Sequence, residues 1–519
     1  MTSEVMTGPS PGIGTPGAGG HHHRVAVIGA GFTGLTVGLA LLRRGVEDVV
    51  LLERADEVGG VWRDNTYPGV GVDTPSPLYQ LRRMTNPDWS DLYAPGHEVL
   101  DYSRRLARTD GLRDRVRFGH DVHDARWDPA ARCWRIRTDQ GPLTADVLVS
   151  AAGLVSDPKL PDVPGLDAFP GPSFHSSRWD HDIDLVGKRV AIVGTGASTV
   201  QIVPEIQPVV SELHLLQRTP AWVMPKPDRP VPERTRRRLA ANPFLMRMQF
   251  DLTYVGAEIL AAARRVRMLR TGMMRIGRRH LEEQVDDPDL RERLTPDFEY
   301  LCKRPLVSND YLPAVSAPNT TLHTGGLAEV RGSTVVAADG TSAEVDVIVF
   351  GTGFEIGATS PIARRVLDAS GRSLSDHWGA VPHAYLGMSY PGFPNFFLMQ
   401  GPNATSGASS TLLFAEAQGR YVADAVATMA RDGIETVDVR PEVERRWTRR
   451  VRTRSARTVW EVGGCASYYQ NDNGVNVVMW PGNTAEYQLR TRRFRRSAFR
   501  TVAGRRGAGR PLDVVAPVT

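Results

Sequence analysis

The ordered part of the chain opens with Arg24-Val25-Ala26-Val27-Ile28-Gly29-Ala30-Gly31-Phe32-Thr33-Gly34. The apolar run before Gly29 has the length of a buried strand, and the stretch from Leu35 to Arg44 has helical character. A second apolar run, Val49 to Leu52, ends in Glu53. The succession of strand, glycine turn, helix, strand and acid predicts a βαβ dinucleotide-binding unit of the Rossmann type.

Each glycine has its own role in such a unit. Gly29 permits the tight turn, Gly31 lets a pyrophosphate approach the backbone, and Gly34 lets the helix pack on the strand. The N-terminus of the helix then faces the phosphates. Glu53 lies 24 residues after Gly29, where a carboxylate accepts hydrogen bonds from ribose hydroxyls. An ordinary glycine turn would leave Glu53 unexplained, so these residues predict a dinucleotide site.

The same pattern occurs a second time. A strand from Arg189 to Val193 precedes Gly194-Thr195-Gly196-Ala197-Ser198-Thr199 and a helix to about Ile206. Another strand, Glu212 to Leu216, ends in Gln217-Arg218-Thr219. Thr199 stands at the third glycine position, so this match is looser than the first.

The residue at the strand end distinguishes the two units. Arg218 can pair with a 2′-phosphate, which a carboxylate such as Glu53 would repel. The first unit is therefore predicted to bind FAD, and the second to bind NADPH through Gly194, Gly196 and Ser198. The alternative for Arg218 is an exposed arginine on a loop.

These units predict an α/β fold with two Rossmann-like dinucleotide-binding domains. Similar strands that end in small residues, Ala145 to Gly153 and Val345 to Phe354, flank the second unit, so the NADPH domain is predicted to be inserted in the FAD domain. The predicted divisions are a disordered leader over 1–23, an FAD-binding part over 24–155, an NADPH-binding domain over 156–340 with a helical insert at about 230–300, a second FAD-binding part over 341–488 and a basic tail over 489–519.

Composition is that of an ordinary globular enzyme. Of 519 residues, 41% are apolar and 23% charged, and the net charge of +5 is too balanced to indicate nucleic acid. No apolar run of about 18 residues could span a bilayer, and the Gly- and Pro-rich start lacks the order of a signal peptide.

The cysteines and the histidine tract predict no further chemistry. Cys133, Cys302 and Cys465 form no CxxC pair or metal knuckle, so we expect no disulfide framework, no dithiol mechanism and no metal site. A reducing cytoplasm fits this usage. His21, His22 and His23 could bind a metal, but beside the leader we expect them in a solvated linker.

Two further stretches carry a family resemblance. Val58-Gly59-Gly60-Val61-Trp62 and Asn65-Thr66-Tyr67-Pro68-Gly69, together with the nucleotide units, resemble the flavin-containing monooxygenase superfamily, in which such a stretch wraps the flavin. Phe169-Pro170-Gly171-Pro172-Ser173-Phe174-His175-Ser176-Ser177-Arg178-Trp179-Asp180 is similar to the Baeyer–Villiger monooxygenase fingerprint, FxGxxxHxxxW followed by Pro or Asp. Trp179 favours the ketone-oxidising branch over the related N- and S-oxidising enzymes. His175 and Trp179 are expected to orient the two domains.

The resemblance also implies site residues. Arg304 would be the active-site arginine and Asp73 its carboxylate neighbour, while Lys303 would help Arg218 and Thr219 hold the 2′-phosphate. Positions matching the flavin-side segments and the C-terminal loop near the cofactors are Gly60, Trp62, Asp73, Gly401-Pro402-Asn403, and Ser467-Tyr468-Tyr469 through Trp480-Pro481-Gly482. Two departures concern pocket geometry: Phe350-Gly351-Thr352-Gly353 replaces the commoner Ala-Thr-Gly, and Tyr468 stands where many members have Trp.

The activity that the resemblance implies is an FAD- and NADPH-dependent Baeyer–Villiger oxidation. One oxygen atom of O2 would enter next to a ketone carbonyl, giving an ester or lactone through a flavin C4a-peroxide. A guanidinium such as that of Arg304 suits an anionic step because it stays charged at any working pH. The expected partners are a small-molecule ketone and O2. Alternatives are an N- or S-oxidising flavin monooxygenase and a non-catalytic flavoprotein.

Two basic stretches have no part in that chemistry. The segment from Phe244 to His280 mixes Met and Leu with seven arginines between Arg264 and Arg279. We expect a helical insert that packs its apolar side on its own protein and solvates its arginines, rather than a helix on a membrane surface; lining the substrate entrance is a third option. Residues 490–510 are expected to form a solvated, partly disordered tail.

Overall fold

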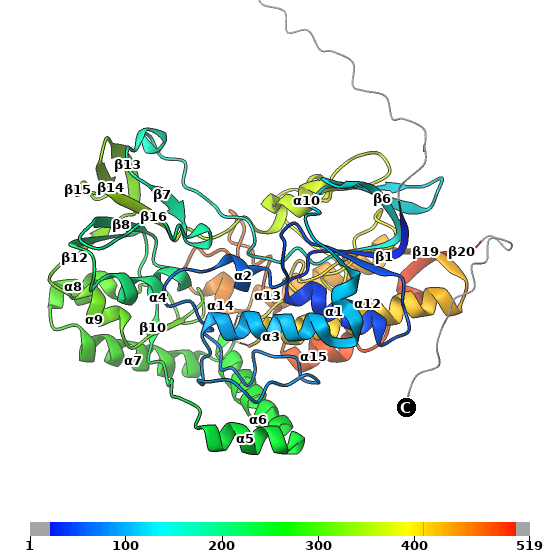
Figure 1. Ribbon diagram of the computed structural model, residues 1–519, viewed down its shortest axis with the longest axis horizontal. Coiled ribbons are helices and arrows are strands. Elements are labelled where there is room, and N and C mark those ends of the chain that lie inside the picture. Colours follow the sequence, from blue (N-terminus) through cyan, green and yellow to red (C-terminus); the bar gives the residue numbers. More distant parts are fainter. Residues whose placement is uncertain (1–20, 408, 505–519) are drawn as a thin grey trace, which may run out of the picture.

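The structure, a computed structural model, describes residues 21–407 and 409–504, and is built around two sheets (Figure 1). The strands of the first sheet are β1 (His22–Ile28), β2 (Val49–Leu52), β3 (Val116–Arg117), β4 (Val122–Asp128), β5 (Cys133–Thr138), β6 (Gly141–Ser150), β17 (Val366–Leu367) and β18 (Phe396–Leu398). They stand in the order β17-β4-β5-β6-β1-β2-β3, and β18 pairs with β6. The pairs β1–β2, β1–β6 and β2–β3 are parallel, as a Rossmann unit requires.

The second sheet is parallel throughout. Its strands are β7 (Ser173–His175), β8 (Arg189–Val193), β9 (Glu212–Gln217), β12 (Thr320–Thr324) and β16 (Val347–Phe350), in the order β12-β9-β8-β16-β7. The chain leaves the first sheet after β6, builds the second, and returns to the first with β17 and β18. The predicted α/β fold, with one Rossmann-like unit inserted in the other, is confirmed.

One helix of each glycine motif packs behind its turn. In the first unit α1 (Phe32–Leu42) lies between the sheet and the long helix α12 (Thr411–Arg431), and it is buried along nearly its whole length. A helix covered on both sides needs no polar face, which explains its uniformly apolar and small residues. In the second unit the corresponding helix is α4 (Ala197–Ile206).

The looser second motif is compensated at the neighbouring strand. In the first unit a Cβ on Gly34 would lie 1.9 Å from the Gly29 carbonyl oxygen, so only glycine fits. In the second unit Thr199 occupies that helix position, and the strand-end residue facing it is Gly351, where an added Cβ would lie 2.2 Å from Thr199 Oγ1. Threonine at position 199 and glycine at position 351 therefore compensate each other in volume, because the larger side chain of one occupies the space that the other leaves free.

Replacing Gly351 by alanine should destabilise the second unit by about 1–3 kcal/mol and weaken the NADPH binding predicted for that unit, because the new methyl group overpacks Thr199. The double variant Gly351→Ala/Thr199→Gly should recover most of that loss. The Thr199 hydroxyl has no hydrogen-bond partner among the described residues, so removing it breaks no hydrogen bond. Thermal unfolding and NADPH kinetics of the four proteins of this double-mutant cycle would check the coupling. Independent, additive effects would show that the two positions do not share the space.

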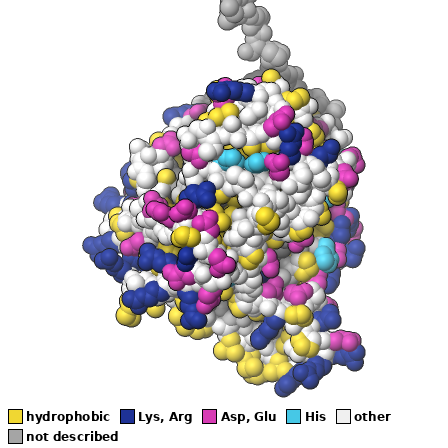
Figure 2. Space-filling view, turned by 90° about the vertical axis from the view of Figure 1, so that its left-hand side faces the viewer, with side chains coloured by type: hydrophobic (Ala, Val, Ile, Leu, Met, Phe, Trp, Pro, Cys, Tyr) yellow, Lys and Arg dark blue, Asp and Glu magenta, His cyan; other side chains and the backbone are white. Residues whose placement is uncertain are grey.

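The helical insert begins beside the second sheet, and two of its helices, α5 and α6, form the lower end of the molecule (Figure 1). Its helices are α5 (Glu233–Ala241), α6 (Pro243–Ala261), α7 (Arg267–Gln284) and α8 (Pro288–Leu294). Two of its arginines are buried rather than solvated: Arg264 donates to the Ala261 carbonyl at 2.6 Å, and Arg270 donates to Glu299 at 2.6 Å. Hydrophobic side chains gather at the surface of this end instead (Figure 2). The segment is helical, as expected. The expectation that it solvates its arginines is wrong for Arg264 and Arg270, and the expectation that it packs its apolar side on the protein is wrong for the apolar side chains that are exposed.

Both ends of the described chain are more ordered than predicted. His22 and His23 are not in a linker: they form the start of β1, and His23 Nδ1 lies 2.9 Å from Asp48. Near the other end β20 (Phe499–Ala503) pairs with β19 (Ile434–Val439), and Phe499 is buried. Apolar anchors within the basic stretch thus fix it on the core. Residues 1–20 of the predicted leader and 505–519 of the predicted tail lie outside the described residues.

The other elements of the described residues connect and cover these sheets. The helices are α2 (Val61–Asp64), α3 (Gly96–Arg108), α9 (Tyr311–Val315), α10 (Pro361–Arg365), α11 (Leu374–Trp378), α13 (Pro441–Ser455), α14 (Val459–Val462) and α15 (Thr484–Arg490), and the strands are β10 (Val223–Met224), β11 (Leu306–Val307), β13 (Leu327–Arg331), β14 (Thr334–Ala337) and β15 (Ser342–Glu344). Short 3-10 helices cover Thr109–Arg115, Leu166–Ala168, Ser176–Arg178, Ala262–Arg264, Gly357–Thr359 and Arg496–Ala498. Over residues 21–407 and 409–504, no helix is both long and apolar enough to cross a membrane.

Candidate active site

A cavity of about 1450 Å³ opens at the carboxyl ends of β1, β2 and β6. Its lining includes Gly29, Gly31, Glu53, Gly60 and Trp62, all predicted from the sequence to bind a cofactor. The lining also includes Arg304 and Met479 from distant parts of the chain, so the space extends from the first glycine motif to later segments.

Glycines that line this cavity allow close approaches of the backbone. Gly60 has φ +55°, and a Cβ there would lie 3.1 Å from the Cα of Gly31. Gly29 has φ +96°, and its Cβ would lie 2.8 Å from the Ala151 carbonyl oxygen. Side chains at these positions would crowd the backbone next to the N-terminus of α1. Bare backbone at a helix N-terminus fits a pyrophosphate.

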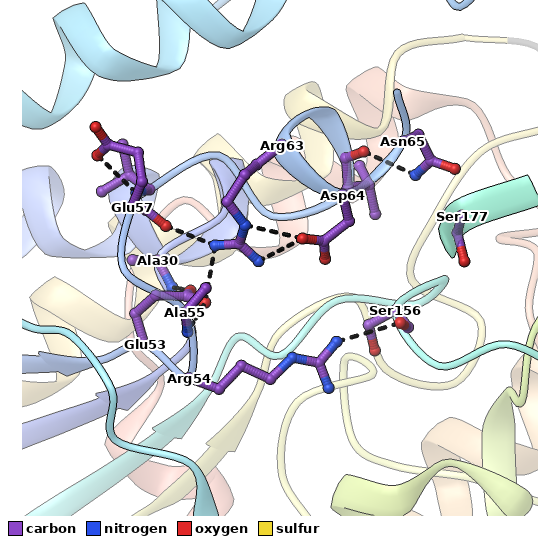
Figure 3. A network of polar contacts seen from close by, with 12 residues as sticks. Ala30, Glu53, Arg54, Ala55, Glu57, Arg63, Asp64, Asn65, Ser156 and Ser177 are labelled. Atoms are coloured by element: carbon purple, nitrogen blue, oxygen red, sulfur yellow. Dashed lines mark hydrogen bonds and ion pairs between the residues drawn. The ribbon is translucent and has the colours of Figure 1, made fainter. Parts of the chain in front are cut away.

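Glu53 is held at the end of β2 by the glycine turn itself. Its Oε2 accepts a hydrogen bond from Ala30 N at 2.8 Å, and its Oε1 accepts from Ala55 N at 3.1 Å and from Arg63 Nη1 at 3.0 Å (Figure 3). Each carboxylate oxygen can accept about two hydrogen bonds, so Oε2 keeps a free position toward the cavity. This orientation suits a ribose hydroxyl.

The sequence reasoning missed two arginines of this wall. Arg63 directly follows Trp62 and joins Glu53 to Asp64, donating to Asp64 Oδ1 at 2.8 Å (Figure 3). Arg54 follows Glu53 and donates to Asp157 Oδ1 at 3.0 Å. Both line the cavity. Both arginines directly follow residues that were predicted to bind the cofactor. This position could have indicated them from the sequence, because basic side chains beside a pyrophosphate site can contact the negative charge of the pyrophosphate.

Arg304 reaches the same cavity from a distant part of the chain. Its Nε donates to Asp73 Oδ2 at 2.7 Å, and its Nη2 donates to the other carboxylate oxygen, so the pair is bidentate. Arg304 lines the cavity, whereas Asp73 is not among the residues that line it. The charge of Asp73 raises the pKa of Arg304. Burial alone would raise the pKa of Asp73, but the charge and hydrogen bonds of Arg304 lower it below its ordinary value. The pair is therefore ionised at every working pH.

Lys303 lies near Arg218, which directly follows the second strand of the second glycine unit. Burial lowers its pKa, and the nearby positive charge of Arg218 lowers it further, against the opposite effect of Asp297. Lys303 Nζ also lies 5.1 Å from the ring centre of Phe298. Two cations held close together indicate a position for an anion. Of these two neighbours in the sequence, Arg304 thus lines the cavity of the first unit and Lys303 lies near Arg218 of the second.

Comparison with known proteins agrees with this geometry. Residues 22–359 match the family model described as flavin-binding monooxygenase-like. A Baeyer–Villiger monooxygenase of Streptomyces coelicolor is 47% identical over 91% of both chains. Among solved structures, the closed form of a cyclohexanone monooxygenase has a TM-score of 0.82 at 26% identity, covering 94% of this chain and 100% of that one. OTEMO in complex with FAD and NADP has a TM-score of 0.81 at 26% identity, covering 91% and 97%.

This chain is a Baeyer–Villiger member of the flavin-binding monooxygenase-like family. The resemblance stated from the two glycine motifs and the Phe169–Asp180 stretch is thereby confirmed.

The remaining predicted residues of the monooxygenase lie in three places. Gly196 and Ser198 lie at the N-terminus of α4, where a Cβ on Gly196 would have no atom nearer than 3.8 Å. Thr219 accepts a hydrogen bond from Thr195 Oγ1 at 2.9 Å through its carbonyl. Gly401 lies outside the large cavity and lines a neighbouring cavity of about 570 Å³. A Cβ on Gly401 would lie 2.3 Å from the Gly387 carbonyl oxygen, so this glycine allows a close approach of two backbones.

The expectation that the cysteines form no disulfide needs correction. Cys302 and Cys465 are bonded, although 163 positions separate them, and Cys133 stays free and buried. Glu299 N also donates to the Gly463 carbonyl at 2.9 Å. The bond therefore fastens the segment that precedes Lys303 and Arg304 to the C-terminal loop that carries Tyr468, which also lines the cavity. Because two of the three cysteines are bonded, cysteine usage no longer supports a reducing cytoplasm, and a cytoplasmic location stays a prediction.

Reduction of the Cys302–Cys465 bond should lower the stability of the monooxygenase by about 2–4 kcal/mol, because a long loop gains conformational freedom in the unfolded chain. Thermal unfolding with and without a phosphine reductant would measure the loss. A Cys302→Ser variant should start at the lower value and not respond to reductant, and Cys133→Ser should respond like the parent protein. Three free thiols in the denatured, unreduced protein would contradict the bond.

The fingerprint residues lie where the chain crosses between the sheets. His175 ends β7, and its ring lies 5.3 Å from that of Phe354, which follows β16 on the returning chain. Trp179 packs edge-on against Phe174 at 5.2 Å. Both contacts lie within the second sheet and its core, so the expectation that His175 and Trp179 orient the two domains stays a prediction.

Acid should destabilise the monooxygenase partly through His175. Burial lowers the pKa of His175 from 6.5 to about 4. At pH values between these two, the unfolded chain therefore binds a proton at His175 that the folded chain does not bind. The contribution of neutral His175 to the free energy of unfolding is therefore complete above pH 6.5 and decreases as the pH drops toward 4, by up to about 3 kcal/mol. Unfolding of His175→Gln across this range should show a shallower pH slope. An equal slope in both proteins would assign the effect to other groups.

Proposed function

We infer that this chain is an FAD- and NADPH-dependent Baeyer–Villiger monooxygenase that inserts one oxygen atom of O2 next to a ketone carbonyl. Ketone, O2, NADPH and a proton give an ester or lactone, NADP+ and water. The observation that carries this conclusion is the position of Arg304, which is fixed by Asp73 and lines the cavity of the first glycine motif.

The residues of the cavity fit FAD. Gly29, Gly31 and Gly60 would take the pyrophosphate, Glu53 the ribose, and Trp62 the wall beside the ring system, with Gly34 and Gly401 allowing the close backbone packing around them. When bound, the flavin accepts the reducing equivalents of NADPH and activates O2. We propose that Asp73 is a positioning residue, since it contacts Arg304 and does not line the cavity.

Arg304 would act by charge. Oxygen insertion passes through negative charge on oxygen, and a permanent cation that donates hydrogen bonds stabilises such charge. Asp73 occupies Nε and one Nη of Arg304, which leaves N–H groups of the guanidinium for the cavity. Because Asp73 fixes the plane of the guanidinium, little reorientation is needed during the reaction.

NADPH would bind at the second motif. Gly194, Gly196 and Ser198 would face its pyrophosphate, and Arg218, Thr219 and Lys303 its 2′-phosphate. Since Lys303 and Arg304 are neighbours, occupation of the second site would fix the segment that delivers Arg304 to the first.

Product analysis tests the proposed function. Purified yellow protein would be given NADPH, labelled ¹⁸O2 and a panel of cyclic and aryl ketones, sulfides and amines, with products identified by mass. We expect an ester or lactone carrying one labelled oxygen. Oxygen found only on sulfides or amines would assign the chain to the N- or S-oxidising branch. Untouched NADPH would contradict an enzyme function.

A further inference from the structure

Helix α6 (Pro243–Ala261) has two apolar faces, and the protein covers one of them. Met246 and Phe250 are buried, and Phe250 packs with Leu78 and Leu413. Another set of apolar side chains on the helix is exposed: Phe244 at 71%, Met248 at 45%, Leu252 at 66%, Val255 at 52% and Ile259 at 61%. We call these five residues the α6 stripe.

The α6 stripe is a continuous surface. Its members follow one another at intervals of four, four, three and four residues, which places them on the same side of a helix. At 1.5 Å per residue the stripe is about 22 Å long. Val266 and Met268, which follow α6 in the chain, are also exposed, at 41% and 79%. Single exposed apolar residues are ordinary, but an aligned row marks an interaction surface.

Positive charge frames the stripe. Helix α5 contacts α6 and carries Arg234 and Arg238, α6 itself carries Arg247, and Arg267 precedes Met268. Among the described residues none of these four forms an ion pair with a carboxylate. Figure 2 shows hydrophobic side chains at this end of the molecule with basic ones beside them.

The acidic residues of α6 both have partners. Asp251, whose side chain is 46% exposed, forms an ion pair with Arg82 at 2.9 Å, and Glu258 accepts a hydrogen bond from Thr484 N at 3.1 Å. Helices α5 and α6 together carry five arginines and three acidic residues, so the charge around the stripe is positive on balance.

We propose that the α6 stripe and its arginines dock the protein on the surface of an anionic phospholipid membrane. The apolar side chains would enter the boundary between headgroups and acyl chains, while the guanidinium groups meet lipid phosphates. The helix would lie in the membrane surface, since none of the described helices could cross a membrane. A symmetric contact with a second copy fits less well, because it would bring the same arginines together.

The docking surface is connected to the active-site region. Ala261 and Ala263 at the end of α6 are buried, and Ala263 packs in the same apolar cluster as Tyr469 and Met479. Met479 lines the large cavity. Docking at the stripe would thus place the enzyme next to a phase in which apolar ketones concentrate; this last step rests on the proposed function, whereas the docking itself does not.

Vesicle co-sedimentation tests the proposal. The purified full-length holoenzyme would be mixed at low salt with vesicles of phosphatidylcholine alone or of phosphatidylcholine containing phosphatidylglycerol. We expect at least about tenfold tighter binding to the anionic vesicles, lost at high salt. Leu252→Glu and Ile259→Glu, made separately, should each weaken binding about tenfold and leave NADPH oxidation with a water-soluble ketone unchanged.

Leu489→Glu is the matched control, since Leu489 is 69% exposed and lies outside the stripe. It should bind vesicles like the parent protein. Equal binding by all variants, or no preference for anionic vesicles, would overturn the proposal. Sedimentation velocity supplies a second test, because a dimer of the parent protein that Leu252→Glu converts to a monomer would make the stripe a self-association surface.

Discussion

Arg304→Ala should lower the kcat for ketone oxidation about 100- to 1000-fold while FAD stays bound. The guanidinium lines the cavity but takes no part in the glycine turn or in the Glu53 contacts that would hold the dinucleotide. Steady-state kinetics with a ketone, together with the flavin absorbance of the purified variant, would measure both quantities. Arg304→Lys keeps a charge but loses the two-point contact with Asp73, so we expect it to retain only a small part of the activity.

The Asp73 variants separate positioning from charge. Asp73→Asn should lower kcat about tenfold to 100-fold with little change in KM, because a neutral amide holds the guanidinium less firmly than a carboxylate. Asp73→Glu should recover part of the loss. If Asp73→Asn matched the parent protein in kcat, Arg304 would be held by its surroundings rather than by this carboxylate. If Arg304→Ala lost its flavin, the assigned role would be wrong.

Arg218→Ala and Lys303→Ala should each raise the KM for NADPH about 10- to 100-fold, because a hydrogen bond between charged groups contributes about 1.5–3 kcal/mol. The KM for NADH should stay nearly constant, since NADH lacks the 2′-phosphate. The double variant should therefore approach equal use of both coenzymes. Initial rates over a range of NADPH and NADH concentrations would show this change.

Lys188→Ala serves as the control for charge in general. Lys188 is exposed in the same domain but precedes β8 at the opposite end of the second sheet. It should leave both KM values unchanged. Equal loss of NADPH and NADH affinity in Arg218→Ala would mean that this arginine supports the fold of the site and does not distinguish the coenzymes.

The two nucleotide units could be predicted from the sequence because all their signals are local. A strand, a glycine turn, a helix and a second strand are set by residues within one short stretch, and their order fixes where the strand-end residue lies. Glu53 and Arg218 could therefore be assigned to different cofactors before any long-range contact was known. The insertion of one unit in the other also followed from order along the chain.

The contacts between distant segments needed the tertiary structure. Asp73 and Arg304 are 231 positions apart, and the sequence suggested their pairing only through the family resemblance. Cys302 and Cys465 gave no spacing signal, and the compensation in volume between Thr199 and Gly351 looked like two unrelated departures. Such partners depend on how whole elements pack, which no local pattern encodes.

Exposure was likewise decided only by the tertiary structure. The sequence of α6 predicts an apolar helix, but periodicity does not tell which apolar side the protein covers. Phe250 is buried and Leu252 is exposed because Leu78 and Leu413 stand on one side alone. The sequence by itself determined the two cofactor units, since the signals for them are local. The tertiary structure decided which distant side chains meet in the active site and which apolar side chains stay exposed at the surface.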